Sequence, residues 1–276
     1  MKMGDLKMDL VVRETLFNHV RSWMLDAGAL IKDSIDDPLT ISTKSNVNDL
    51  VTEVDQNVEK FFAKKIKEHY KDHLLLSEEG FGDNLKDTKG TVWIIDPIDG
   101  TMNFINQKRN FAISIGIYHE GIGEIGFVYD VMANNLYSAM RDGGAFKNDQ
   151  RLPLLNQNIA LEESIICLNH YWLCENRLID EKVMQSLVKD VRGTRTYGSA
   201  ALEFAHVAEG IIEAYLTMRL EPWDIAAGRI IVTEVGGKVT NINGEEVGML
   251  ERSSIITGNP NVHKKIVSEY LKNIKK

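Results

Sequence analysis

The chain has 276 residues, of which 43% are hydrophobic and 26% are charged, and its formal net charge is −8. This composition is typical of a globular protein with enough apolar residues for a sizeable core. The negative charge argues against direct nucleic-acid binding, which requires a basic surface to neutralise phosphates. No apolar run approaches the roughly 20 residues of a membrane helix, so we expect no contact with a membrane. With no secretory signal and only Cys167 and Cys174, the sequence predicts a reducing, cytoplasmic location.

Periodicity predicts two amphipathic helices near the N-terminus. The first occupies the first ~35 residues, where apolar side chains recur at helical spacing: Leu16, Val20, Trp23, Met24, Ala27 and Leu30. The second follows the segment 48–55 with Thr52 as its cap, and an apolar face of Val58, Phe61, Phe62 and Ile66.

From Thr91 the apolar pattern changes to that of β-strands. A strand over 91–96 is predicted to end at Pro97, and the runs 111–118, 122–131 and 135–140 predict an antiparallel meander. Its turns are expected at Glu120-Gly121 and Asn134-Asn135.

The second half mixes both periods. Strands are predicted over 164–168, 212–218 and 253–257, and helices over 177–189, 199–208 and 224–235, followed by a final helix. This order indicates an α+β protein whose sheets and helices stack in layers. A boundary near Leu155 would separate an N-terminal half, 1–155, from a C-terminal half, 156–276, although we expect one compact unit.

Candidate metal ligands begin in the segment Asp96-Pro97-Ile98-Asp99-Gly100-Thr101. Two carboxylates leave the end of a buried strand, and Pro97 bends the chain so that both can turn toward one point. Gly100 permits a close backbone approach, and Thr101 can begin a helix with free N–H groups for an anion. Taken alone, the segment is also compatible with a turn that carries solvated acids.

Further acids stand at two other predicted element ends. Glu78 and Glu79 follow an apolar run, and Asp224 lies in the first turn of a helix that Pro222 can begin. Asp224 could instead merely complement the helix dipole, and Glu79 is expected to be solvated. Together these acids could form an oxygen-rich pocket of the kind that suits Mg²⁺.

These residues carry a resemblance to a known family. The segment WIIDPIDGTMNF resembles the signature of the inositol monophosphatase family, and PWDIAAGRIIVTEVGGKV resembles its C-terminal signature. The segments SEE and DLVTEVD match as well, in the same order. The resemblance implies the layered α-β-α-β-α sandwich of the inositol monophosphatase and fructose-1,6-bisphosphatase type, a homodimer, and inhibition by lithium.

The resemblance also implies a role for each matching residue. Glu78, Asp96 and the carbonyl of Ile98 would hold one Mg²⁺ ion, and Asp96, Asp99 and Asp224 a second; a third ion would lie near Glu78. Thr101, supported by Asp55, would orient the attacking water together with Glu78. The remaining residues would contact the substrate: Asp99, Gly100 and Thr101 near the phosphate, Gly198, Ser199 and Ala200 against the alcohol, and Lys44 as a positively charged residue near the phosphate.

The implied activity is hydrolysis of inositol monophosphate or a related small phosphorylated alcohol by metal-activated water. The metals would neutralise the doubly anionic ester, so an acidic protein can bind it. At Thr217 the chain departs from animal inositol monophosphatases, which carry a glutamate there for inositol hydroxyls. Arg219 could take a second anionic group, as in NADP or fructose 1,6-bisphosphate, or be a solvated surface arginine. A protein-binding regulatory role is the alternative to catalysis.

Two further patterns predict no site. Gly121-Ile-Gly123-Glu-Ile-Gly126 has the spacing of a dinucleotide-binding loop, but it runs into a strand rather than opening a helix. Cys167, His170 and Cys174 offer three zinc ligands, whereas a closed structural site needs four.

Overall fold

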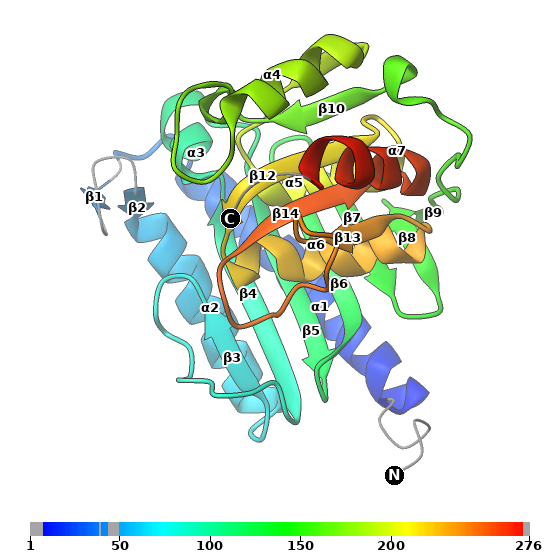
Figure 1. Ribbon diagram of the computed structural model, residues 1–276. Coiled ribbons are helices and arrows are strands. Elements are labelled where there is room, and N and C mark those ends of the chain that lie inside the picture. The colour runs from blue at the N-terminus through cyan, green and yellow to red at the C-terminus, as the bar shows by residue number, and fades with distance from the viewer. Residues whose placement is uncertain (1–7, 39, 44–49, 273–276) are drawn as a thin grey trace.

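Two β-sheets with helices between and around them organise the chain in the computed structural model, which describes residues 8–38, 40–43 and 50–272 (Figure 1). The layers follow the order α-β-α-β-α, as the resemblance implied, and the α+β fold is confirmed. The helices of the layers are α1 (Leu10–Ser34), α2 (Glu53–His69), α4 (Glu181–Asp190), α5 (Ala200–Glu209), α6 (Pro222–Glu234) and α7 (Pro260–Lys265).

A seven-stranded sheet lies between the first pair of helices, α1 and α2, and the central pair, α5 and α6. Only its edge strand β3 runs parallel to its neighbour; the other pairs are antiparallel. In spatial order the strands are β3 (Leu74–Ser77), β4 (Thr91–Asp99), β5 (Ala112–His119), β6 (Ile122–Asp130), β7 (Asn135–Met140), β8 (Gly144–Lys147) and β9 (Gln150–Arg151).

A five-stranded mixed sheet lies on the other side of α5 and α6, and α4 and α7 cover its outer face. In spatial order its strands are β11 (Gly193–Arg195), β10 (Ile165–Leu168), β12 (Ala214–Leu220), β14 (Ser253–Gly258) and β13 (Lys238–Thr240). The remaining elements are short: β1 (Ile41–Thr43) paired with β2 (Leu50–Thr52), α3 (Thr101–Gln107), and the helical turns η1 (Leu161–Glu163), η2 (His170–Leu173) and η3 (Ile266–Leu271).

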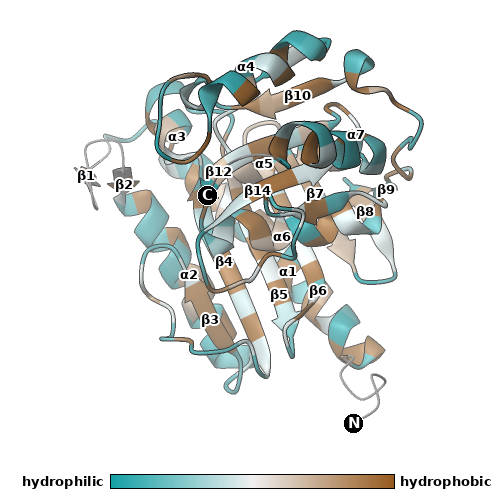
Figure 2. Cartoon of the chain, in the orientation of Figure 1, coloured by the Kyte–Doolittle hydropathy of each residue, from teal (hydrophilic) through white to brown (hydrophobic). Residues whose placement is uncertain are grey.

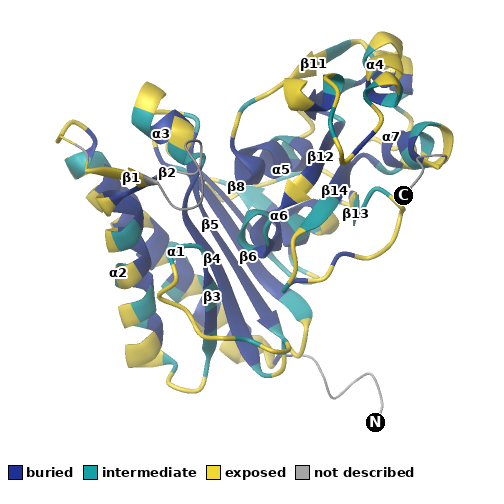
Figure 3. Ribbon diagram, turned by 60° about the vertical axis from the view of Figure 1, so that its left-hand side comes forward, coloured by how far each residue is buried: buried dark blue, intermediate teal, exposed yellow. Residues whose placement is uncertain are grey.

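Alternation along the strands assigns side chains to the layers. In β4, Trp93 and Ile95 pack against α1 and α2, whereas Val92 and Ile94 face the central helices. In Figure 2 the strands β4, β5 and β6 are largely hydrophobic while α2 carries a hydrophilic face. Figure 3 shows the same strands buried and exposed residues gathered on the outer helices. A sheet covered on both faces requires such near-continuous apolar strands.

Three expectations about these elements need correction. Leu30 is 49% exposed, and Ile31 takes the buried position instead. The helix expected over 177–189 begins at Glu181, because Asp180 caps it by accepting from the Lys182 N–H at 2.9 Å. Pro97 does not end its strand, since β4 continues to Asp99. The predicted turn at Glu120-Gly121 is confirmed, with both residues at positive φ.

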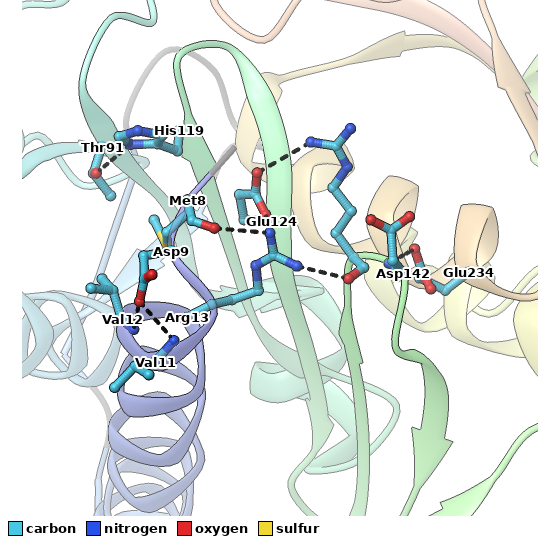
Figure 4. Close-up of polar contacts among 11 residues, drawn as sticks. Met8, Asp9, Val11, Val12, Arg13, Thr91, His119, Glu124, Asp142 and Glu234 are labelled. Carbon is cyan, nitrogen blue, oxygen red and sulfur yellow. Dashed lines mark hydrogen bonds and ion pairs between the residues drawn. The ribbon is translucent and has the colours of Figure 1, made fainter. Parts of the chain in front are cut away.

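A buried ion pair ties α1 to the seven-stranded sheet (Figure 4). Arg13 Nη2 lies 2.7 Å from Glu124 Oε2, and Arg141 Nη1 lies 3.3 Å from Glu124 Oε1. Arg13 also donates from Nη1 to the Arg141 carbonyl at 2.9 Å. Because Glu124 is fully buried in β6, its charge needs both partners, and the contacts fix the start of α1 on the sheet.

Glycines in β5 and β6 let α6 lie directly on the sheet. A Cβ at Gly116 would stand 2.7 Å from the Ala226 Cβ, and one at Gly126 would stand 2.7 Å from the Ala227 carbonyl oxygen. Gly228 of α6 leaves room in the same way for the ring of Phe204 in α5. The position of α6 therefore depends on the absence of side chains at these sites.

We predict that Gly116→Ala lowers the free energy of unfolding by about 1–3 kcal/mol, because the new methyl group must push α6 off the sheet. Urea-induced unfolding measures the change. Gly248→Ala is the matched control, since nothing lies within 4 Å of a Cβ there. Equal stabilities of the two variants would contradict the close packing.

The surroundings of His263 should make the folded protein less stable at acidic pH. Its Nε2 lies 2.9 Å from Thr240 Oγ1, and burial, with a smaller effect of Lys238, lowers the pKa of His263 from 6.5 to about 4. As the pH falls below 6.5, the unfolded chain takes up a proton that folded His263 refuses, so this contribution to stability declines until about pH 4.

Between pH 7 and pH 5, the wild type should therefore lose about 2 kcal/mol more stability than His263→Gln, which cannot titrate. The measurement is urea unfolding of both proteins at each pH. Parallel pH profiles for the two would show that His263 titrates normally in the folded state.

Candidate active site

A β-bulge at the end of β4 brings Asp96 and Asp99 to the same side. Residues three apart in a regular strand point to opposite faces. Here Asp96 pairs with Ser114 and Asp99 with Ala112, so that Pro97 and Ile98 together oppose the single residue between them. The extra residue restores a common direction for the two carboxylates. Pro97 suits the bulge because it has no N–H to contribute to the ladder.

Asp224 reaches the same point from the N-terminus of α6. One carboxylate oxygen from each of Asp96, Asp99 and Asp224 lies within 4.8 Å of the others. Pro222 is the first residue of α6, as predicted, and Asp224 Oδ2 accepts from the Glu221 N–H at 2.8 Å in a capping box. This contact fixes the carboxylate of Asp224 on the side that faces β4.

Glu78 adds a fourth carboxylate from the end of β3. Its charge acts on Asp96, Asp99 and Asp224 and raises the pKa of each. The acids predicted at three separate element ends therefore lie together. Among the described residues, no lysine or arginine forms an ion pair with Asp96, Asp99 or Asp224.

Burial and mutual repulsion disfavour the charged forms of these acids. Burial first, and then Glu78, raises the pKa of Asp96 well above its usual value. Burial first, and then Asp99, does the same for the pKa of Asp224. Burial raises the pKa of Asp99 to about 6. Several oxygen ligands that need positive charge, and that form no ion pair with a lysine or arginine of the described part of the chain, fit a hard divalent cation such as Mg²⁺.

The N-terminus of α5 also contacts Asp99. Ser199, the N-cap, donates from Oγ to Asp99 Oδ2 at 2.5 Å, and the Ala201 N–H donates to the same oxygen at 2.6 Å. Ser199 is only 3% exposed. The segment predicted to lie against the alcohol, Gly198 to Ala200, is thus joined directly to a candidate metal ligand.

Thr101 connects the β4 bulge to α2. Its Oγ1 donates to the Ile98 carbonyl at 3.1 Å and lies 3.3 Å from Asp55 Oδ1. Asp55 is fully buried in the first turn of α2, where its Oδ2 accepts from Thr52. Burial, opposed by the Thr52 bonds and assisted by Glu78, raises the pKa of Asp55 to about 6.

Gly100, which follows β4, and Gly198, which precedes α5, lie close together. Both have positive φ, 96° and 79°. A Cβ on Gly100 would lie 3.2 Å from the Gly198 carbonyl oxygen, and a Cβ on Gly198 would lie 3.0 Å from Asn103 Nδ2. Asn103 of α3 donates from this nitrogen to the carbonyls of Asn110 at 2.8 Å and Tyr197 at 2.7 Å.

Two buried glutamates that support the site were not predicted. Glu59 of α2, fully buried, accepts from Ser77 Oγ at 2.6 Å and from the Glu79 N–H at 2.7 Å, which holds the loop that carries Glu78. Glu203 of α5 accepts from the Tyr197 N–H at 2.9 Å and the Gly198 N–H at 3.3 Å. The sequence could have indicated them, because each acid stands at a position of its helix where the periodicity places buried residues. Glu59, for example, lies four residues after Asp55 and one after Val58.

A cavity of about 620 Å³ opens beside the acid cluster. Asp99 and Asp224 lie on its wall together with Ser199, and Thr217 and Arg219 line it farther along β12. Thr217 is buried, whereas Arg219 is exposed. Lys44, the predicted basic residue, lies outside the described residues.

The glycine pattern over 121–126 and the set of Cys167, His170 and Cys174, for which the sequence predicts no site, form no ligand cluster among the described residues. Gly123 and Gly126 lie in β6, where they make room for α6 rather than for a phosphate. Cys167 is buried in β10 and Cys174 is exposed, and both are free thiols. Within the described residues, no helix is long and apolar enough to span a membrane.

Known proteins resemble this chain over almost its entire length. The model of the inositol monophosphatase family matches residues 13–275. Inositol-1-monophosphatase of Bacillus subtilis (strain 168) is 53% identical over 251 residues, which cover 91% of this chain and 94% of that protein.

Two solved structures share the fold. Inositol monophosphatase-II from Staphylococcus aureus MSSA476 has a TM-score of 0.86 at 44% identity, over 94% of this chain and 96% of that one. An inositol monophosphatase/NADP phosphatase complexed with Mg²⁺ and phosphate has a TM-score of 0.87 at 27% identity, over 96% and 99%. The chain therefore belongs to the inositol monophosphatase family, whose members are phosphatases that hydrolyse phosphate monoesters.

Proposed function

We propose that this chain is a Mg²⁺-dependent phosphomonoesterase that hydrolyses inositol monophosphate or a related small phosphorylated alcohol. The convergence of Asp96, Asp99 and Asp224 within 4.8 Å, at the wall of a cavity, carries the proposal. A phosphate monoester is doubly anionic, so a site for it must supply positive charge, and these acids can do so only by holding cations. The resemblance to a phosphatase complexed with Mg²⁺ and phosphate agrees with this assignment.

The donor set divides into two ligand groups that share Asp96. Glu78, Asp96 and the Ile98 carbonyl would hold one ion, and Asp96, Asp99 and Asp224 a second. All are oxygen ligands, as Mg²⁺ prefers. Bound Mg²⁺ supplies charge neutralisation and Lewis acidity toward the phosphoryl group. We propose two to three ions per site and, from the family resemblance, a homodimer.

Thr101 and Glu78 are proposed to orient the attacking water. The Thr101 hydroxyl donates its proton to the Ile98 carbonyl or to Asp55, so Oγ1 keeps a lone pair to accept a hydrogen bond from water. The Glu78 carboxylate can accept the second proton of that water. Asp55 holds Thr101 in place, because its other oxygen is fixed by Thr52 at the start of α2.

The phosphate is proposed to lie on the backbone of Gly100 and Thr101. Gly100 is the cap of α3, and the N–H groups at a helix start have no partner within the helix. The alcohol part of the substrate would then extend into the cavity beside Gly198, Ser199 and Ala200. Asp99 lies between the two regions, since it contacts Ser199 on one side and the acid cluster on the other.

Asp96→Asn should abolish Mg²⁺-dependent phosphate release, by at least about 100-fold, because it removes the ligand that both ions share. The same variant should raise the melting temperature of the metal-free protein by about 2–4 °C for each kcal/mol of repulsion relieved. Activity assays and thermal unfolding in a chelator measure the two effects. Asp26→Asn, at an exposed position of α1, is the control that should change neither. Activity like that of the wild type would disprove the metal assignment.

A panel of phosphate esters tests the substrate class: myo-inositol 1-phosphate, fructose 1,6-bisphosphate, NADP and 3′-phosphoadenosine 5′-phosphate. We expect phosphate release that requires Mg²⁺. Arg219, exposed on the cavity wall, favours as second candidates the substrates with an additional anionic group, in which case Arg219→Gln lowers their turnover selectively. No release from any ester would instead support a protein-binding role.

A further inference from the structure

Glu203 is a buried carboxylate on the wall of the active-site cavity to which the reaction described above gives no role. It lies in the first turn of α5, and its side chain is 4% exposed. Its helix begins at Ser199, so Glu203 lies one turn behind the residue that contacts Asp99. It is therefore on the alcohol side of the cavity and not among the metal ligands.

The two carboxylate oxygens of Glu203 have different surroundings. Oε1 accepts both backbone donors, the Tyr197 N–H at 2.9 Å and the Gly198 N–H at 3.3 Å. These bonds hold the side chain in one orientation and support the turn that carries Gly198. Oε2 accepts neither of these two hydrogen bonds, so it can accept one from another donor.

Two side chains of β12 that carry hydroxyl groups, Tyr215 and Thr217, lie on the same cavity wall as Glu203. All three residues line the cavity, and all three are buried. A carboxylate has about four acceptor positions, and the two backbone N–H groups occupy those of Oε1, so Oε2 can accept a further hydrogen bond.

We propose that Glu203 is a specificity-determining residue that accepts a hydrogen bond from a hydroxyl group of the substrate's alcohol part. The inference rests on the proposed phosphatase function and deepens it, since it assigns a residue of this chain that discriminates between substrates with and without a hydroxyl group in the alcohol part. A hydroxyl satisfies the open acceptor position without adding a charge. A substrate that lacks the hydroxyl leaves a buried acceptor unpaired, which is how polar sites reject such analogues.

Two esters with the same carbon skeleton test the proposal. Glycerol 2-phosphate carries two hydroxyl groups, and isopropyl phosphate carries none. We expect kcat/KM of the wild type to be about tenfold or more higher for glycerol 2-phosphate, with Mg²⁺ present throughout. The difference should appear mainly in KM, because the hydroxyl is remote from the reacting phosphorus atom.

Glu203→Gln is the informative variant. Its amide oxygen can still accept from Tyr197 and Gly198, while an NH₂ group replaces the oxygen left for the substrate. The preference for glycerol 2-phosphate should fall about tenfold, toward one, with little change for isopropyl phosphate. Glu209→Gln is the matched control, because Glu209 also lies in α5 but bonds Tyr137 and Lys147 away from the cavity. Its substrate preference should stay that of the wild type.

The outcomes separate this inference from the proposed function. Equal losses for both esters in Glu203→Gln would make Glu203 a support of the Gly198 turn only, and would overturn the inference. A wild-type ratio near one would overturn it as well, even if the variant fails to fold. If the wild type hydrolyses neither ester nor any other phosphate monoester, the proposed function itself fails.

Discussion

Repulsion among the carboxylates of the buried Asp96 and Asp99 and the half-buried Asp224 is the force that the surrounding structure must oppose. These groups lie within 4.8 Å of one another, and burial raises the pKa of each. Such a cluster separates unless its backbone is fixed from several directions. The bulge in β4 fixes two of the acids, and the capping box of α6 fixes the third. The divalent cations proposed above would relieve this repulsion.

The layered architecture explains why rigid elements rather than loops carry these acids. The β4 strand is covered on both faces, and α6 lies directly on β5 and β6 through Gly116 and Gly126. Neither element can move without opening the core. Glu59 extends this rigidity to the loop after β3, because its carboxylate accepts hydrogen bonds from Ser77 Oγ and from the Glu79 N–H. The elements that pack the core are thus the same ones that fix the geometry of the site.

The sequence predicted most of this arrangement, and its errors have physical causes. Apolar periodicity located the central strands and helices, and acids at element ends indicated the cluster. Pro97 was expected to stop its strand, because the rule that proline ends a ladder does not distinguish an end from a bulge. Glu59 and Glu203 were missed because an acid within an amphipathic helix is normally solvated. Only the tertiary structure shows that both are buried.

The two sides of the site differ in how freely they can change. The acid cluster is built from β3, β4 and α6, which pack within the central core, so a change in how these elements pack would disturb both the cluster and the fold. The alcohol side is built from the start of α5 and from β12, where Thr217 and Arg219 line the cavity without contributing to the acid cluster. Ser199 is the link, since its hydroxyl bonds Asp99. Substitutions on β12 could therefore change the wall of the cavity while the acid cluster stays unchanged.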